Sequence, residues 1–386
     1  GIHKNSIPDI VVYINGLPLA IIEAKSPKVS ITDAISDLGY YQENSQKLFY
    51  YNQICVGMNK GKALYGTIGS QFAHYSKYKL EDLAELELLV ERTATAQDIL
   101  IYSLFKKEML LDIIRNFTIF EIDQGRTIKK LPRYQQLRAV NKILDRLKTE
   151  NKGGVVWHTQ GSGKSITMVY LATKLRREEA GFDNPTIIVV TDRIDLDNQI
   201  SSTFRRTGFS NPIQAVSISN LKELLKDSYG KTLMTTIHKF QERAEEQKEE
   251  IEILSDKSNV FVLIDEAHRS QYGMTAAYMR NSLPNAKFIA FTGTPIDKEQ
   301  KSTLRTFYGG SDYIDKYTIK QSVEDGNTLA IRYQTGMPEY FIEKDLMNEV
   351  FSSVFGHESE EKQAKLKSRA ASLDTFLMAK RRVEEI

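Results

Sequence analysis

The sequence predicts an α/β protein in which a small mixed sheet is followed by a larger parallel sheet covered by helices. Between residues 153 and 292, short apolar runs alternate with polar or glycine-containing turns and helical stretches, as in parallel sheets. At the front, two apolar runs separated by Asn15-Gly16 precede a helical pattern and two further strands. The length of 386 residues exceeds one ordinary domain, so we expect two or three.

Changes of pattern divide the chain into four predicted segments. We expect the small mixed sheet over residues 1–78, a helical connector over 79–124, the parallel-sheet domain over 125–300, and a lead-in to a further domain over 301–386. In the first segment we expect strands near 10–14, 18–25, 53–58 and 63–68 and a helix near 31–43. In the third we expect strands at 153–157, 186–190, 231–236, 260–264 and 287–292.

Composition and charge narrow the class of protein. The chain is 41% hydrophobic and 26% charged, as globular proteins with apolar cores are. It has no run of about 18 apolar residues and no secretory signal pattern, so we expect no membrane association. Cys55 is the only cysteine, which excludes an internal disulfide, favours the cytoplasm and predicts a small buried apolar role for this thiol. The net charge of +2 neither favours nor excludes nucleic acid as a partner.

The strongest chemical signal is the segment "GGVVWHTQGSGKSITMVYLATKL". A strand leads into a glycine-rich loop and then a helix, so backbone N–H groups can surround a phosphate, Lys164 can reach terminal phosphates and Ser165 can ligate Mg²⁺. His158 stands where this phosphate-loop pattern expects Gly or Ala. Upstream, "PRYQQLRAV" offers a glutamine that can read an adenine edge, and we prefer Gln136 to Gln135. The predicted ATP-binding residues here are Gln136, Gly161, Ser162, Gly163, Lys164 and Ser165.

In "VFVLIDEAHRS", two acids, Asp265 and Glu266, directly follow five apolar residues. Such a run is typical of a strand buried on both faces, and doubly wound sheets bind ligands at the carboxyl ends of central strands. We expect Asp265 to hold Mg²⁺ through water and Glu266 to orient or deprotonate the water that attacks the γ-phosphate. His268 either couples the nucleotide to a neighbouring loop or caps a turn.

Three further stretches, "VVTDRIDLDNQI", "TTIHKF" and "FTGTPI", each end a predicted strand with polar residues. Side chains in the first two suit contact with a phosphodiester backbone, and the hydroxyls of the third suit coupling between nucleotide and nucleic acid. The candidates for DNA binding or coupling are Thr191, Arg193, Thr236, His238, Lys239, Thr292 and Thr294, together with His268.

Residues 131–296 resemble the first, RecA-like motor domain of superfamily 2 helicases and translocases of the DEAH type, because "RYQQ", "GSGKS", "TDR", "DEAH" and "TGT" occur in that order. More narrowly, "VVWHTQGSGKSITM", "LIDEAHRSQYG" and "INGLPLAIIEAKSP" resemble the R subunit of type I restriction enzymes over about residues 7–335. This resemblance implies an ATP-driven translocase on double-stranded DNA with an endonuclease domain. It also implies separate methyltransferase and specificity subunits as partners.

The opening hairpin then gains a chemical interpretation. Asp9, followed on the next strand by Glu23 and Lys25, matches the PD-(D/E)xK endonuclease pattern, in which two carboxylates hold Mg²⁺ against the scissile phosphate and the lysine assists the attacking water. A regular two-residue turn at Asn15-Gly16 would leave Glu23 on the opposite face from Asp9. We therefore predict a longer turn or a β-bulge. The competing interpretation is an exposed edge hairpin whose charges keep it soluble.

The sequence departs from the two families at several points. Many PD-(D/E)xK nucleases carry Gln-x-x-x-Tyr on the following helix, whereas here the spacing gives Asp37 and Tyr41. An upstream acid and the Gln-x-x-Gly-Arg-x-x-Arg motif of a second motor domain are not in the sequence, so we expect an N-terminal piece with weak ATP binding and little DNA-stimulated hydrolysis. Two alternatives stay open: a repair or defence helicase with an inactive nuclease-like domain, and a non-catalytic assembly module.

Overall fold

The computed structural model describes most of the chain. The described ranges are 6–123, 125–191, 194–207, 212–226, 229–240, 252–266, 272–295, 297–298, 301–302, 312–329 and 344–370. The predicted site residues Arg193 and His268 lie outside these ranges. The chain forms two compact units, residues 1–329 and 330–386, and each is described by itself.

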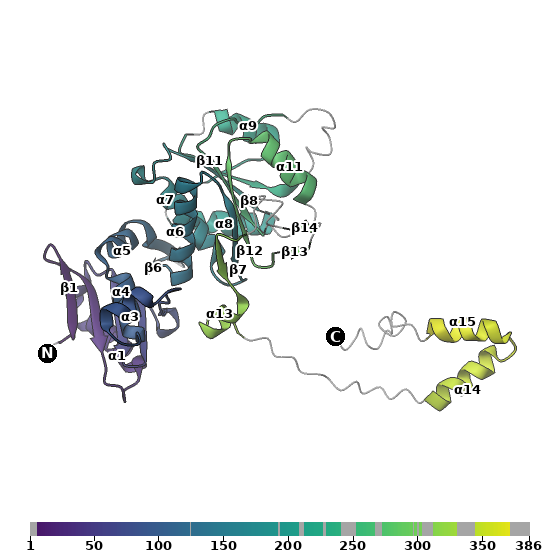
Figure 1. The fold of residues 1–386 in the computed structure, drawn as a ribbon, viewed down its shortest axis with the longest axis horizontal. Coiled ribbons are helices and arrows are strands. Elements are labelled where there is room, and N and C mark those ends of the chain that lie inside the picture. Colours follow the sequence, from purple (N-terminus) through teal and green to yellow (C-terminus); the bar gives the residue numbers. More distant parts are fainter. Residues whose placement is uncertain are drawn as a thin grey trace. The chain divides into compact units, whose positions relative to one another are not determined.

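A four-stranded mixed sheet opens the first unit, in purple and blue in Figure 1. Its strands are β1 (Ile10–Ile14), β2 (Leu17–Ala24), β3 (Ile54–Asn59) and β4 (Lys62–Gly66), in the order β1-β2-β3-β4. β2 and β3 run parallel, whereas both hairpins are antiparallel. The predicted strands are therefore confirmed to within two residues at each end.

Helices cover both faces of this front sheet. Helix α1 (Ile31–Asn44) begins at Ser30, whose hydroxyl accepts a hydrogen bond from the Thr32 N–H, as N-cap residues do. Its buried residues have the i, i+3, i+4, i+7 spacing of an amphipathic helix and are Ile31, Ala34, Ile35 and Leu38. Two of them, Ile35 and Leu38, share a core with Ile21, whereas the next residue, Ile22, packs on the opposite face, in the same core as α4 (Ala96–Leu104). Alternate residues of β2 thus face α1.

The connector is helical but is divided into short elements. They are α3 (Ala84–Val90), α4, α5 (Lys107–Asp112) and the π-helical turn η2 (Ile113–Phe117), whereas the short helices α2 (Gln46–Phe49) and η1 (Phe72–His74) belong to the preceding segment. An antiparallel hairpin of β5 (Ile119–Asp123) and β6 (Arg126–Lys130) follows. This hairpin was not predicted from the sequence.

The second sheet has seven strands in the order β15-β7-β12-β11-β8-β10-β9, and all of its neighbouring strands run parallel. Its strands are β7 (Gly154–His158), β8 (Thr186–Thr191), β9 (Ile213–Gln214), β10 (Thr232–Thr236), β11 (Val260–Asp265), β12 (Lys287–Thr292) and β15 (Asp315–Tyr317). Five of them were predicted, which confirms the parallel sheet, whereas β9 and β15 were not. A two-stranded ribbon, β13 (Asp297–Lys298) with β14 (Lys301–Ser302), lies outside this sheet.

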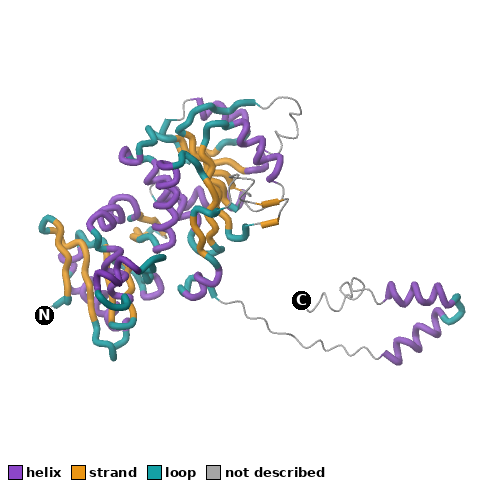
Figure 2. Tube along the Cα trace, viewed as in Figure 1, coloured by secondary structure: helices purple, strands orange, loops and turns teal. Residues whose placement is uncertain are grey.

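The large sheet is doubly wound, with helices on each face (Figures 1 and 2). One face shares a core with α6 (Tyr134–Thr149), α7 (Lys164–Leu175) and α8 (Ile194–Arg206), and the other with α9 (Ile218–Lys226) and α11 (Tyr272–Ser282). Successive strand residues alternate between these cores, as Ile187 and Ile188 do. Two short helices, η3 (Glu178–Ala180) and α13 (Ile319–Glu324), complete the described part of this unit.

The second unit contains two described helices, α14 (Lys344–Phe355) and α15 (Glu360–Ala370). Residues 371–386 lie outside the described ranges. Among the residues that the structure describes, no helix combines the length and apolar character needed to cross a membrane.

Candidate active sites

The predicted phosphate loop joins β7 to α7, and it comprises residues 158–163. Gly161 and Gly163 have φ angles of +79° and +87°, which favour glycine over residues with a side chain. At Gly163 a Cβ would also lie 2.5 Å from the amide nitrogen of Gln136. The backbone conformation explains both glycines, and the close approach of Gln136 is a second reason for glycine at position 163.

Lys164 is the first residue of α7, and its side chain lies beside the acids at the end of β11. Its Nζ lies 3.2 Å from Oε1 of Glu266, and its side chain is only 8% exposed. Glu266 has a φ of +51°, a conformation that is uncommon for a residue other than glycine. Asp265, the last residue of β11, is buried at 6% exposure. The lysine and the two acids predicted to handle ATP therefore meet at one end of the sheet.

The third strand end at this site belongs to β12. A Cβ at Gly293 would lie 3.4 Å from Nζ of Lys164 and 3.2 Å from the backbone nitrogen of Gln160. Thr292 is fully buried, and its hydroxyl accepts a hydrogen bond from the Thr294 N–H at 3.2 Å. The "TGT" segment thus lies against the phosphate loop.

Gln136 is turned toward the phosphate loop. Its Oε1 accepts a hydrogen bond from the Arg133 N–H at 2.8 Å, and its Nε2 donates to the carbonyl of Gly163 at 3.2 Å. The residue is 4% exposed. In this arrangement both polar atoms of the amide are engaged within the protein, so Gln136 supports the loop.

The candidates for DNA contact occupy other strand ends of the same sheet. Thr191 and Thr236 are register partners at the ends of β8 and β10, and both are buried. His238 is exposed, whereas Nζ of Lys239 donates to the carbonyl of Ala215. These residues lie at the carboxyl ends of the parallel strands, and His238 and Thr294 are exposed to solvent.

A β-bulge shapes the front hairpin. Asn15 and Gly16 form a two-residue turn with positive φ angles, so Ile14 pairs with Leu17. The register then shifts, because Val12 pairs with Ala20 and Tyr13 with Pro18, and Ile10 consequently lies opposite Ile22. This shift confirms the bulge, one of the two alternatives predicted.

The bulge brings Asp9 beside the end of β2. The Asp9 Oδ2 accepts a hydrogen bond from the Ala24 N–H at 2.8 Å. Glu23 is 3% exposed and lies on the face of β2 that is turned toward α1. Its Oε2 is buried and has no hydrogen-bond partner among the described residues. A buried carboxylate oxygen of this kind is costly unless a proton, a cation or a water satisfies it.

Lys25 is held between two carboxylates. Its Nζ lies 2.7 Å from Oε1 of Glu23 and 2.5 Å from Oδ2 of Asp37. The hydrogen bonds that the ammonium donates, to Asp37 foremost and then to Glu23, raise the pKa of Lys25, so the amine stays charged. The Tyr41 hydroxyl donates to the carbonyl of Ile7 at 3.2 Å and to Oε1 of Glu23 at 3.5 Å. Asp37 and Tyr41, at the two positions of the Gln-x-x-x-Tyr pattern, therefore both contact the Glu23–Lys25 pair.

Neither the phosphate-loop site nor the hairpin site has enough protein ligands among the described residues to coordinate a metal ion by itself. Within the described ranges, no group of three or more His, Cys, Asp or Glu side chains is arranged to hold a metal ion. Mg²⁺ commonly binds through one or two carboxylates and keeps several waters. The pairs Asp9 with Glu23 and Ser165 with Asp265 have the oxygen donors that such binding uses.

One charged group near the phosphate loop was not predicted from the sequence. Asp315, on β15, lies 2.8 Å from Nε2 of His158 and is 2% exposed. Its sequence context, "YIDKYT", has no strand alternation or turn signal that would have identified it. The only available clue was the histidine at the first loop position.

Comparisons with known proteins show which families this chain resembles. Residues 135–364 match the family model described as SWI2/SNF2 ATPase, and residues 2–73 match that of the type I restriction enzyme R protein N terminus. The type I restriction enzyme HindI endonuclease subunit of Haemophilus influenzae is 38% identical over 353 residues, which cover 85% of this chain and 33% of that protein. The type I restriction enzyme SsaAORF53P endonuclease subunit of Staphylococcus saprophyticus is 28% identical over 332 residues, covering 83% and 34%.

The chain spans about a third of the length of these curated relatives. Among solved structures, the SWI2/SNF2 ATPase core of Sulfolobus solfataricus in complex with dsDNA aligns with a TM-score of 0.33 and 16% identity. That alignment covers 45% of this chain and 35% of the other.

Proposed function

Because the chain belongs to the SWI2/SNF2 ATPase family, we propose that it binds and hydrolyses ATP where the phosphate loop meets the end of β11. The observation that carries this proposal is the 3.2 Å contact between Lys164 and Glu266. When phosphate oxygens enter, they can replace the Glu266 carboxylate at the ammonium. Glu266 is then available to orient the attacking water, while Lys164 offsets charge on the transferred phosphoryl group.

Asp265 and Ser165 would hold Mg²⁺ at this site. The hydroxyl and the carboxylate are hard oxygen donors, and the phosphates and water would complete the coordination. The ion would supply charge neutralisation between the phosphate oxygens. Thr292 and Thr294, at the end of β12, would couple the nucleotide to DNA.

We further propose that the hairpin site cuts DNA. Asp9 and Glu23 would hold Mg²⁺, and Lys25 would steady the attacking water or the developing charge. Two features support this: the bulge that brings Asp9 beside Ala24, and the buried unpartnered oxygen of Glu23. An edge hairpin whose charges only maintained solubility would not require a buried carboxylate.

Together these sites fit the motor and nuclease subunit of a type I restriction–modification enzyme. The similarity to endonuclease subunits of such enzymes, and the match of residues 2–73 to the R protein N terminus, support this proposal. The whole enzyme would translocate on double-stranded DNA using ATP and cleave it with Mg²⁺. Methyltransferase and specificity subunits would be its partners, in the cytoplasm.

One observation favours a second candidate, an ATP-driven helicase whose front domain no longer cuts. Asp37 stands where glutamine is common and forms an ion pair with Lys25 at 2.5 Å. A lysine neutralised by two carboxylates is a weaker aid to an attacking water. Metal and DNA binding would have to rearrange this cluster before cleavage.

The two candidates are separated by cleavage assays on the enzyme assembled with its partner subunits. Lys25→Ala is compared with Lys28→Ala, because Lys28 is an exposed lysine three residues away. We expect Lys25→Ala to reduce Mg²⁺-dependent cleavage at least ~100-fold and Lys28→Ala to leave it unchanged. Equal cleavage by both variants would favour the helicase without nuclease activity.

A further inference from the structure

Asp315 is a buried carboxylate beside the phosphate loop with an unusual concentration of partners. Its oxygens lie 2.8 Å from Nε2 of His158, 2.8 and 3.0 Å from Nε and Nη2 of Arg138, and 3.2 Å from Nζ of Lys142. Arg138 and Lys142 lie on α6, whereas His158 is the first residue of the phosphate loop. The carboxylate thus joins an edge strand, a helix and the loop.

The segment around Asp315 contacts the loop at two further points. The Thr159 N–H donates to the carbonyl of Tyr317 at 2.9 Å, so β15 holds the first two loop residues. Farther along, a Cβ at Gly161 would lie 3.7 Å from Oγ1 of Thr328, and that hydroxyl is 2.6 Å from the Ser322 hydroxyl. Residues 312–329 therefore follow the loop from its start to its middle.

Helix α6 completes the support from the other end of the loop. Nε2 of Gln136 donates to the carbonyl of Gly163, and Arg138, two residues later, binds Asp315 through two nitrogens. Bidentate arginine–carboxylate pairs fix orientation as well as charge. Both ends of the loop are consequently tied to one helix, and Asp315 closes the arrangement.

The charges are consistent with a permanent link. Burial alone would raise the pKa of Asp315, but hydrogen bonds from His158 and Arg138 outweigh it and lower the pKa, so the carboxylate is ionised. Burial lowers the pKa of His158, helped by the nearby charges of Arg138 and Lys164. A neutral imidazole donates its Nε2–H to Asp315. The histidine thus provides a hydrogen-bonding side chain where phosphate loops expect Gly or Ala.

We propose that His158 and Asp315 are positioning residues that hold the phosphate loop in its nucleotide-binding conformation. The inference rests on the proposed ATP binding. Because neither residue needs to touch the nucleotide, their effect should appear as weaker binding of MgATP rather than as loss of the fold. Restoring the donor at His158 should restore the binding.

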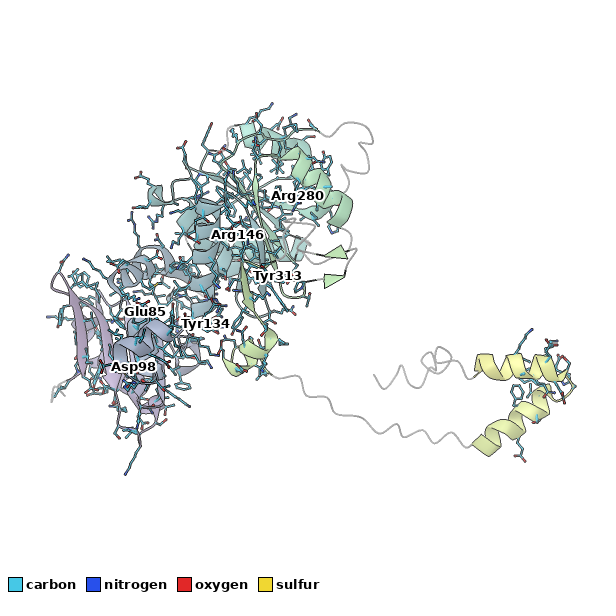
Figure 3. All side chains as sticks on the ribbon, viewed as in Figure 1. Glu85, Asp98, Tyr134, Arg146, Arg280 and Tyr313 are labelled. Atoms are coloured by element: carbon cyan, nitrogen blue, oxygen red, sulfur yellow. The ribbon has the colours of Figure 1, made fainter. Side chains whose placement is uncertain are left out.

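The chain provides a matched control in Asp325. Like Asp315 it has a buried carboxylate, here with 2% side-chain exposure, and it lies on the same segment. Its partners are two tyrosine hydroxyls and two lysines, from Tyr134, Tyr317, Lys77 and Lys79. Tyr134, labelled in Figure 3, connects this cluster to the start of α6. Among the contacts of the Asp325 carboxylate, none is with a phosphate-loop residue of the described chain.

The test compares MgATP binding by the whole chain and four variants, measured by titration well below each unfolding midpoint. We expect Asp315→Asn and His158→Met to weaken MgATP binding ~10-fold or more. His158→Gln keeps a donor at the Nε2 position and should bind MgATP as the unchanged chain does. Asp325→Asn should also bind MgATP as the unchanged chain does. Equal binding by Asp315→Asn and the unchanged chain would overturn the inference alone, as would failure of His158→Gln to outperform His158→Met. No MgATP binding by the unchanged chain would overturn the proposed function and this inference with it.

Discussion

Lys164 and Glu266 lie 3.2 Å apart although 101 residues separate them in the chain. β12 lies between their strands in the sheet order, so the side chains meet across the end of that strand. Gly293, which follows β12, has no side chain to separate them, and a Cβ there would lie 3.4 Å from the ammonium. The proposed hydrolytic site therefore depends on a glycine at this third strand end.

Lys164→Ala should abolish stabilisation by nucleotide. A ligand present at 100 times its dissociation constant stabilises a protein by about 2.7 kcal/mol, and the variant lacks the ammonium proposed to bind the phosphates. The unfolding temperature should rise with MgATP in the unchanged chain but not in the variant. Lys148→Ala is the control, because its ammonium donates to the carbonyl of Glu179. An undiminished shift in Lys164→Ala contradicts the proposed ATP site.

Glu266→Gln should separate binding from turnover. The amide keeps the size of the side chain but cannot accept a proton from the attacking water, so hydrolysis should fall ~100-fold or more. MgATP binding should persist, because Lys164 no longer has a carboxylate competing with the phosphates. Single-turnover hydrolysis and equilibrium binding, measured on the assembled enzyme, distinguish the two effects. A variant that hydrolyses ATP normally assigns the water-activating role to another residue.

Lys129 should make stability depend on pH. It is 9% exposed, and its Nζ donates to the carbonyl of Asn52 and to Oε1 of Gln53, each at 2.7 Å. Burial lowers its pKa from 10.5 to about 8. Between these values the unfolded chain binds more protons than the folded chain, so this residue makes stability rise with pH from about 8 to about 10.5.

Denaturant unfolding near pH 8 and near pH 10 measures this contribution. The free energy of unfolding of the unchanged chain, minus that of Lys129→Met, should increase by ~1–3 kcal/mol over that interval. Lys25→Met is the control: the pKa of Lys25 is raised, so folded and unfolded states are both protonated there and the difference should stay flat. A flat difference for Lys129 as well shows that its amine is solvated.

Cys55 should be unreactive in the folded protein. The thiol is fully buried, and burial raises its pKa to about 12. Because the thiolate is the reactive form, an aromatic disulfide reagent at pH 8 should label it only after unfolding. The labelling rate as a function of denaturant reports opening of the front sheet. Rapid labelling without denaturant is the opposite result and implies local opening around β3.

The sequence predicted the front hairpin to an unusual degree. The demand that Asp9 and Glu23 share a face required an extra residue, and the register shift after Val12 provides it. The alternation of apolar and polar residues could not say whether the turn or the strand would contain that residue. Asn15 and Gly16 favour the left-handed conformations of a tight turn, which leaves the strand to form the bulge.

Five of the parallel strands were predicted because each is a short run of mainly apolar and β-branched residues that is buried on both faces. β15 has no such run: Asp315 and Tyr317 are buried while Lys316 is exposed. The partner that stabilises Asp315, Arg138, lies 177 positions away, a separation that local periodicity cannot detect. Adenine recognition by Gln136 stays a prediction. Its contacts with the Arg133 N–H and the Gly163 carbonyl could not be predicted, because they depend on how α6 packs against the loop.

We propose that this chain contains two separate acid–lysine sites, one for hydrolysing ATP and one for cutting DNA. The most direct measurement follows ATP hydrolysis and cleavage of double-stranded DNA in the same reaction, using the assembled enzyme with Glu23→Gln or Lys164→Ala. We predict that Glu23→Gln abolishes cleavage while ATP hydrolysis continues, and that Lys164→Ala abolishes both. Cleavage that persists in Glu23→Gln, or hydrolysis that persists in Lys164→Ala, contradicts the claim.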